Sequence, residues 1–113
     1  MKEFMMLFRH EPADYQPSPE DIQESIKHWE NWIGGIAAQG KFGSTNQLGY
    51  EGKTIKPGNV ITDGPYAEVK EIIGGYIIVK AESLEEAVEM AKGCPILQIG
   101  GHVEVRNIME MDM

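Results

Sequence analysis

Cysteine is almost absent from this sequence, and the one residue present, Cys94, cannot form a disulfide within the chain. It follows a predicted helix, between Gly93 and Pro95, where a small buried thiol is a more ordinary interpretation than a nucleophile. No pair of cysteines and no pair of histidines has the spacing of zinc ligands. The sequence therefore predicts no metal site, and we expect no cofactor.

Basic residues are scarce relative to acidic ones. The chain has 10 Lys and Arg against 18 Asp and Glu, a formal net charge of −8, and no cluster of Lys and Arg. Proteins that bind nucleic acids or anionic membranes neutralise phosphates with such clusters. We therefore expect neither a nucleic-acid partner nor a membrane partner.

Long hydrophobic runs are also missing. The apolar run near the N-terminus, residues 4–8, is too short for a signal peptide or a membrane span. A cytoplasmic location is the default expectation. With 113 residues the chain can build one hydrophobic core but not two, so we expect a single domain over residues 1–113.

The motifs of several common enzyme classes are absent. The chain has no Ser-His-Asp spacing, no phosphate-binding loop and no dinucleotide-binding fingerprint. The glycine pair at residues 74–75 lies inside a predicted strand, so it is not a phosphate cradle. A functional site must be sought among the remaining titratable side chains.

Two segments have the pattern of amphipathic helices. The first begins at Ser18, a good capping residue, and carries an apolar stripe as far as Gly40, which suits a helix end. The second begins at the capping box of Ser83 and Glu86 and stops at Gly93.

The other regular segments are predicted to be strands and turns. The glycines at residues 74–75 indicate a bulge, or a place where a ligand or a neighbouring backbone comes close. Residues 51–53 have the composition of a hairpin tip, and residues 57–59 predict a further turn before a short strand. The main strands are predicted at residues 4–8, 72–79 and 103–108.

This order of elements predicts an α+β fold, a ferredoxin-like βαββαβ sandwich with an added hairpin. Two right-handed crossovers put both helices on one face of an antiparallel sheet. The strands at residues 4–8 and 72–79 are nevertheless apolar on both sides. A second copy packed sheet to sheet across a two-fold axis would cover the other face, so we expect a homodimer.

The most conspicuous group of charges follows the turn Asp63-Gly64-Pro65. Beyond it, alternation puts Tyr66, Glu68 and Lys70 on one face of the chain, and Glu71 leads into the apolar strand. Charges held between a turn and a buried strand are good candidates for chemistry. The alternative is an ordinary solvated approach to a hairpin.

Other titratable residues are more scattered. His28 lies beside Trp29 at the edge of the helical stripe, where it is either a packing residue or part of a pocket wall. Lys70 or Arg106 could anchor an anionic substrate. Glu104 and Arg106 share one strand face, where such a pair is usually a cross-strand ion pair. The other histidines are His10 and His102.

A set of motifs spread over most of the chain resembles the YCII-related (YciI-like, DGPF-motif) family. The motifs are residues 62–66 and 68–71, Gly74-Gly75-Tyr76, residues 83–87, Gly93-Cys94-Pro95 and residues 103–106. The resemblance implies a dimeric α+β barrel built from ferredoxin-like protomers. It also implies a His-Asp pair in a cleft, for which Asp63 matches the motif and His28 is the candidate histidine. Tyr66 stands where the family motif has Phe.

Two functions remain open. The first is a cofactor-independent proton-transfer enzyme (an isomerase, lyase or dehydrohalogenase) acting on a small cyclic or aromatic anion, with Asp63 and His28 as base and acid. The second is a non-enzymatic dimeric module that binds a small ligand or regulates a partner. In either case the substrate or ligand would contact a set of residues around one pocket. This set comprises Trp29, Trp32, Tyr66, Glu68, Lys70 and Arg106.

Overall fold

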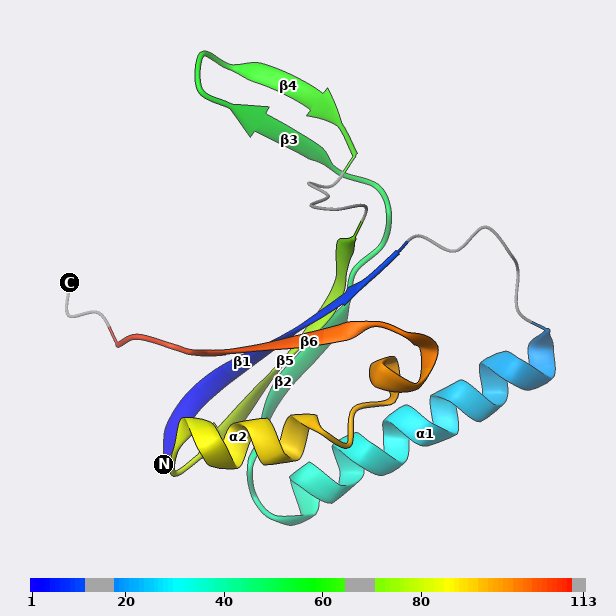
Figure 1. The fold of residues 1–113 in the computed structure, drawn as a ribbon, viewed down its shortest axis with the longest axis vertical. Helices are drawn as coiled ribbons and strands as arrows, with labels where there is room; N and C mark the ends of the chain where they lie inside the picture. The colour runs from blue at the N-terminus through cyan, green and yellow to red at the C-terminus, as the bar shows by residue number, and fades with distance from the viewer. Residues whose placement is uncertain (12–17, 65–70, 111–113) are drawn as a thin grey trace.

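A computed structural model describes residues 1–11, 18–64 and 71–110 of the chain. Four of the described strands form an antiparallel sheet in the order β2-β5-β1-β6, and two more form a separate hairpin (Figure 1). The sheet strands are β1 (Lys2–His10), β2 (Phe42–Gln47), β5 (Ile72–Ala81) and β6 (His102–Asn107). The hairpin strands are β3 (Lys53–Lys56) and β4 (Val60–Asp63), and the helices are α1 (Pro19–Ala38), α2 (Leu84–Ala91) and the 3-10 helix η1 (Pro95–Ile99).

The strand order together with the chain order makes this a ferredoxin-like α+β fold. β1 and β5 occupy the centre of the sheet, and α1 and α2 each lie on the connection from a central strand to an edge strand. Both helices lie on the same side of the sheet (Figure 1). The predicted fold, including an added hairpin between β2 and β5, is confirmed.

Side-chain caps start both α-helices where the sequence predicts. The Ser18 hydroxyl accepts a hydrogen bond from the backbone N–H of Asp21, and the Ser83 hydroxyl accepts one from the backbone N–H of Glu86. Each bond satisfies one of the backbone donors that a helix leaves open at its N-terminus. These caps fix the starting points of the two helices beside the sheet.

The hydrophobic core lies between the helices and one face of the sheet. Alternate residues of β1, such as Met6, and of β5, such as Ile77, are buried on this face against Ile36 of α1 and Ala87 of α2. Such burial stabilises the fold by about 25 cal/mol for each Å² of apolar surface removed from water. The first turns of α1 contribute less than their pattern predicts, because Ile22 and its neighbours remain exposed where the helix extends past the sheet (Figure 1).

The opposite face of the sheet carries no helix in the described part of the chain. Met5 pairs with Ile78, and Leu7 pairs with Tyr76, so these four side chains share one face. All four are only partly buried. We call this surface the uncovered face, and it is the surface for which the sequence predicts a second copy.

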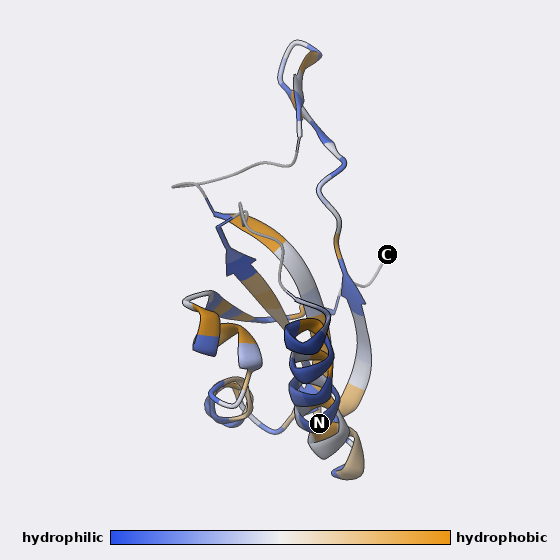
Figure 2. Ribbon diagram, turned by 90° about the vertical axis from the view of Figure 1, so that its right-hand side faces the viewer, coloured by the Kyte–Doolittle hydropathy of each residue, from blue (hydrophilic) through white to orange (hydrophobic). Residues whose placement is uncertain are grey.

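The position of the hairpin tip differs from the prediction. Residues 51–53 do not form the tip, because Lys53 is already in β3 and pairs with Asp63 at the open end of the hairpin. The tip is instead the turn at residues 57–59, where Gly58 and Asn59 have positive φ angles of 85° and 62°. Both segments have turn composition, and the register of β3 with β4 decides between them. The hairpin projects beyond the end of the sheet, apart from both helices (Figures 1 and 2).

The glycine pair in β5 makes the close approach that the sequence predicts. The register between β1 and β5 shifts between Phe8 and Arg9, opposite Gly74. A Cβ atom on Gly74 would clash with the imidazole of His10, and one on Gly75 would lie 2.9 Å from the backbone oxygen of Asn46. The bulge therefore brings His10 close over the start of β5.

Candidate functional site

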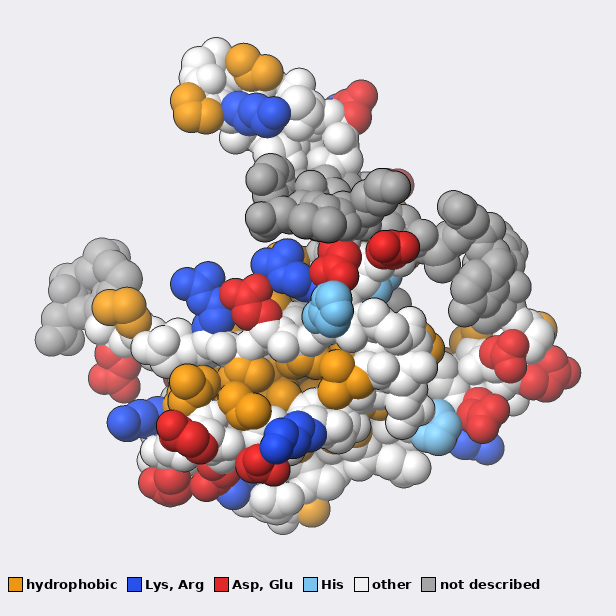
Figure 3. Space-filling model, viewed as in Figure 1, with side chains coloured by type: hydrophobic (Ala, Val, Ile, Leu, Met, Phe, Trp, Pro, Cys, Tyr) orange, Lys and Arg blue, Asp and Glu red, His pale blue; other side chains and the backbone are white. Residues whose placement is uncertain are grey.

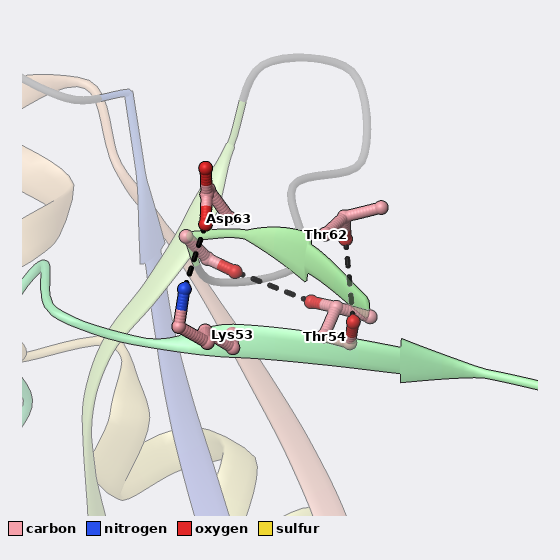
Figure 4. Close-up of polar contacts among 5 residues, drawn as sticks. Lys53, Thr54, Thr62 and Asp63 are labelled. Atoms are coloured by element: carbon pink, nitrogen blue, oxygen red, sulfur yellow. Dashed lines mark hydrogen bonds and ion pairs between the residues drawn. The ribbon is translucent and has the colours of Figure 1, made fainter. Parts of the chain in front are cut away.

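Asp63 lies at the end of β4, in the projecting hairpin. Its Oδ1 accepts a hydrogen bond of 2.7 Å from Lys53 Nζ across the hairpin (Figure 4). The Asp63 side chain is 94% exposed. Beside it, Thr54 and Thr62 make further hydrogen bonds between the strands. Within the described chain Asp63 therefore has the contacts of a residue that joins two strands.

His28 lies on the outer surface of α1. Its Nε2 is 3.8 Å from Glu24 Oε1, one helical turn earlier, and about half of the side chain is exposed. The side chain borders two shallow, open hollows, one of about 440 Å³ along α1 and one of about 170 Å³ between α1 and η1. The imidazole therefore borders a groove on the helical side of the molecule.

Asp63 and His28 do not lie together in the part of the chain that the structure describes. The hairpin that carries Asp63 and the helix that carries His28 lie at opposite ends of the molecule (Figure 1). Each residue has a different charged neighbour, Lys53 for Asp63 and Glu24 for His28. The roles of Asp63 and His28 as base and acid stay a prediction. Within the described chain the two residues share no site.

The predicted pocket residues that the structure describes lie in different parts of the molecule. The ring centroid of Trp29 lies 5.0 Å from that of Phe8, and Trp32 Nε1 donates a hydrogen bond to the backbone oxygen of Met90. Both indoles therefore pack between the helices and the sheet, whereas Arg106 belongs to the uncovered face. Three other predicted binding residues, Tyr66, Glu68 and Lys70, lie outside the described residues.

Ion pairs on the uncovered face connect β1 with β6. Arg9 Nε donates a hydrogen bond of 3.1 Å to Glu104 Oε1, and a second nitrogen of Arg9 is 3.1 Å from the same oxygen. Arg106 Nε approaches the other carboxylate oxygen of Glu104 less closely, at 3.9 Å. The sequence alone predicts a pair of Glu104 with Arg106, but the closer partner of Glu104 is Arg9 on the neighbouring strand.

A histidine and a carboxylate meet at the end of the same face. His102 Nδ1 lies 2.9 Å from Glu71 Oε1, where Glu71, just before β5, and His102, the first residue of β6, approach each other across the end of β1. The Glu71 side chain is 21% exposed and that of His102 is 68% exposed. An imidazole beside a half-buried carboxylate can take up and release a proton in a fixed position.

The sequence indicates His102 and Glu71 individually but not as a pair. The pairing depends on β1 lying between β5 and β6, so that residues distant in the chain end up at one end of the sheet. The strand pattern contains a usable signal, because each residue stands at the start of a predicted strand. Only the ferredoxin-like strand order turns that signal into a contact.

These residues form one group, which we call the charged cluster. It lies on the side of β6 away from the helices, where Figure 3 shows basic, acidic and histidine side chains gathered together. The apolar side chains of the uncovered face continue from it toward β5. The cluster thus combines groups for proton transfer and for anion binding. It consists of Arg9, Glu71, His102, Glu104 and Arg106.

A neutral polar pair lies on the other side of the apolar floor. Asn46 Nδ2 donates a hydrogen bond of 2.8 Å to the Tyr76 hydroxyl oxygen, and the two residues are register partners on β2 and β5. Tyr76 is half-buried. A ligand on the uncovered face would therefore meet charges on one side and a phenol on the other.

No group of three or more His, Cys, Asp and Glu side chains able to hold a metal ion occurs within residues 1–11, 18–64 and 71–110. Over the same residues, neither α-helix is long and apolar enough to cross a membrane.

The family model of the YCII-related domain matches residues 2–112. The chain belongs to the YCII-related domain family. Nothing among the curated proteins matches it. The match of this YCII-related domain includes the charged cluster, the hairpin and both helices, so the resemblance stated from the motifs is confirmed. Family membership by itself names neither a reaction nor a substrate, and these must be argued from the site.

Proposed function

We propose that this YCII-related domain transfers protons on a small cyclic or aromatic anion, without a cofactor, at the uncovered face of its sheet. The observation that carries the proposal is the 2.9 Å approach of His102 Nδ1 to Glu71 Oε1. General acid–base catalysis needs a titratable group held close to the substrate. Glu71 would orient the imidazole through Nδ1, which leaves Nε2 to take and return the proton.

Arg106 would bind the anionic group of the substrate. Its nearest carboxylate oxygen in the described chain is 3.9 Å away, and 69% of its side chain is exposed. Arg9 is held by Glu104 at 3.1 Å and lines the same cluster. A guanidinium can bind a carboxylate through two parallel hydrogen bonds, which fixes its orientation as well as its position.

A second copy of the chain would complete the site by covering the uncovered face. Two apolar surfaces, one partly buried and one exposed, support this arrangement. One is the floor of Met5, Leu7 and Ile78, and the other is the hairpin, where Ile55 and Ile61 face each other in register and are 69% and 58% exposed. A two-stranded hairpin alone is only marginally stable in water. Cover by a partner would also exclude water and strengthen the electrostatics of the charged cluster.

A non-enzymatic ligand-binding module is the second candidate function. The exposure of His102, at 68%, favours it, because a base open to water gains little from a preorganised environment. The same anion would then bind at Arg106 without being altered.

Hydrogen–deuterium exchange tests the enzymatic proposal. A panel of small ring anions with an acidic C–H bond is incubated with the protein in D2O, and exchange is followed by NMR. We expect catalysed exchange for at least one compound, and we expect His102→Gln and Glu71→Gln each to lower it by about 10²-fold or more, which is the contribution typical of general acid–base catalysis.

The competing assignment makes the opposite prediction. If Asp63 and His28 were base and acid, Asp63→Asn and His28→Gln would abolish exchange, and His102→Gln would leave it unchanged. Binding at Arg106 without any catalysed exchange would favour the non-enzymatic module.

A further inference from the structure

Residues of four strands line up in rows across the uncovered face. One row runs from Asn46 through Tyr76 and Leu7 to Glu104, because each is the register partner of the next. Directly paired residues of antiparallel strands point to the same side of a sheet. The next row includes Ile78, Met5 and Arg106 by the same criterion.

The middle of these rows is apolar, and the two ends are polar in different ways. Leu7, Met5 and Ile78 form the floor. On the β6 side stand the charges of Glu104 and Arg106, and on the β2 side stands the neutral pair of Tyr76 and Asn46. Neighbouring strands lie about 4.8 Å apart, so β5 and β6 are separated by roughly 10 Å. A single six-membered ring with one substituent at each end can span this interval.

The hydrogen bond between Asn46 and Tyr76 sets the direction of the phenol proton. Asn46 Nδ2 donates to the Tyr76 hydroxyl oxygen. A phenol has one proton to donate, and in this arrangement it is not used on Asn46. The phenol is therefore a neutral donor held at the β2 side of the apolar floor. Such a donor recognises an oxygen atom that accepts a hydrogen bond.

We propose that the substrate is a cyclic keto acid, with its carboxylate at Arg106 and its ketone oxygen at Tyr76. This inference rests on the proposed function, which it makes more specific. The Tyr76 hydroxyl would donate a hydrogen bond to the ketone and stabilise the negative charge that develops there during proton transfer.

The chemical step is a proton transfer, and it needs no oxidant, reductant or cofactor. His102 Nε2 takes a proton from a carbon next to the ketone, and the C–H electron pair forms a C=C bond while the C=O π pair moves to the oxygen. The enolate is held by Tyr76. When the electrons return, the same carbon takes a proton from the imidazolium, which gives exchange with the solvent. If the ring carries a C=C bond conjugated with the enolate, return of the proton to the far carbon of that bond gives an isomer.

Binding of two matched probes tests this substrate class. Cyclohexanecarboxylate and 4-oxocyclohexanecarboxylate differ at the ketone alone. We expect the wild-type protein to bind the keto acid about three- to tenfold more tightly in an NMR or calorimetric titration, which is the value of one hydrogen bond. Tyr76→Phe should remove this preference and leave the affinity for cyclohexanecarboxylate unchanged.

A second variant tests the role of the phenol proton without removing the Tyr76 hydroxyl. In Asn46→Asp, a carboxylate can only accept, so it draws the Tyr76 proton to itself. The preference for the keto acid should fall here too, although the phenol ring is still present. Circular dichroism checks that both variants remain folded.

The outcomes separate this inference from the proposed function. Equal binding of the two probes to wild type, or a preference that survives Tyr76→Phe, overturns the keto-acid assignment and leaves anion binding intact. Failure of both probes to bind overturns the anion site at Arg106 and with it this inference.

Discussion

At the scale of single residues, the fold changes the acidity of the Cys94 thiol. Cys94 is buried, and burial raises the pKa of its thiol to about 11. A thiolate is the reactive form of cysteine, so this residue is inert at neutral pH. The sequence prediction of a small buried thiol after the second helix agrees with this environment.

We predict that iodoacetamide will not alkylate native Cys94 at pH 8, and that labelling will become fast in denaturant. Because the pKa is higher in the folded protein than its ordinary value of 9.0, the contribution of Cys94 to stability is complete below pH 9 and is lost as pH rises toward 11. Mass spectrometry measures the labelling. Rapid modification of the folded protein would contradict the burial of the thiol.

A second residue-scale prediction concerns Glu86 at the start of α2. Lys41 Nζ lies 2.7 Å from Glu86 Oε1, and this ammonium group holds the pKa of Glu86 below its ordinary value of 4.5. A lowered carboxyl pKa stabilises the fold above the unfolded-state pKa, and that contribution disappears as pH falls through the folded-state value.

Glu86→Gln should therefore be less stable than wild type at pH 7, and the difference should shrink below about pH 4.5. Urea unfolding over a pH series measures it. The matched control is Glu89→Gln, whose ion pair with Lys92 is exposed on both sides and should contribute little. A pH-independent difference for Glu86→Gln would mean that its charge is not involved.

At the scale of elements, α1 contains two glycines that no contact in the described chain explains. A Cβ atom on Gly34 or on Gly35 would have open space around it. Glycine in a helix interior costs about 1 kcal/mol relative to alanine. We predict that Gly34→Ala and Gly35→Ala each raise the free energy of unfolding by 0.5 to about 1 kcal/mol.

The contrasting variant is Gly101→Ala, just before β6. A Cβ atom there would lie 2.8 Å from the backbone oxygen of Arg9 and 2.5 Å from Ile96 Cγ1, so the substitution should destabilise the protein. Thermal unfolding compares the three variants. A loss of stability in Gly34→Ala would indicate that a partner packs on this stretch of α1.

The helices and main strands could be predicted from the sequence because helix caps and apolar patterns depend only on nearby residues. The caps at Ser18 and Ser83 and the apolar strands sufficed for the ferredoxin-like order. The predicted position of the hairpin tip was wrong, because two neighbouring segments have turn composition. Only the pairing of β3 with β4 selects one of them. The contact of His102 with Glu71 could not be read from the chain, because it depends on which strands become neighbours.

At the scale of the whole molecule, our proposal assigns the function to the uncovered face. Its apolar floor and charged cluster need a cover to become an enclosed site, and we expect a second copy to supply it. We predict a dimer in sedimentation velocity experiments. Leu7→Lys, which puts a charge in the middle of the floor, should give a folded monomer.

The control for this prediction is Val88→Lys on α2. Val88 is 39% exposed on the helical side, so a lysine there should leave the dimer intact. A wild-type protein that sediments as a stable, well-folded monomer would remove the basis for an enclosed site between two sheets.

The most direct test of the central claim is the location of ligand binding. Amide chemical shifts of the labelled protein are followed while a small ring carboxylate is added. We predict that the largest changes fall on the uncovered face, around Leu7, Tyr76, Glu104 and Arg106. Changes concentrated around His28 on α1, or around Asp63 on the hairpin, would contradict it.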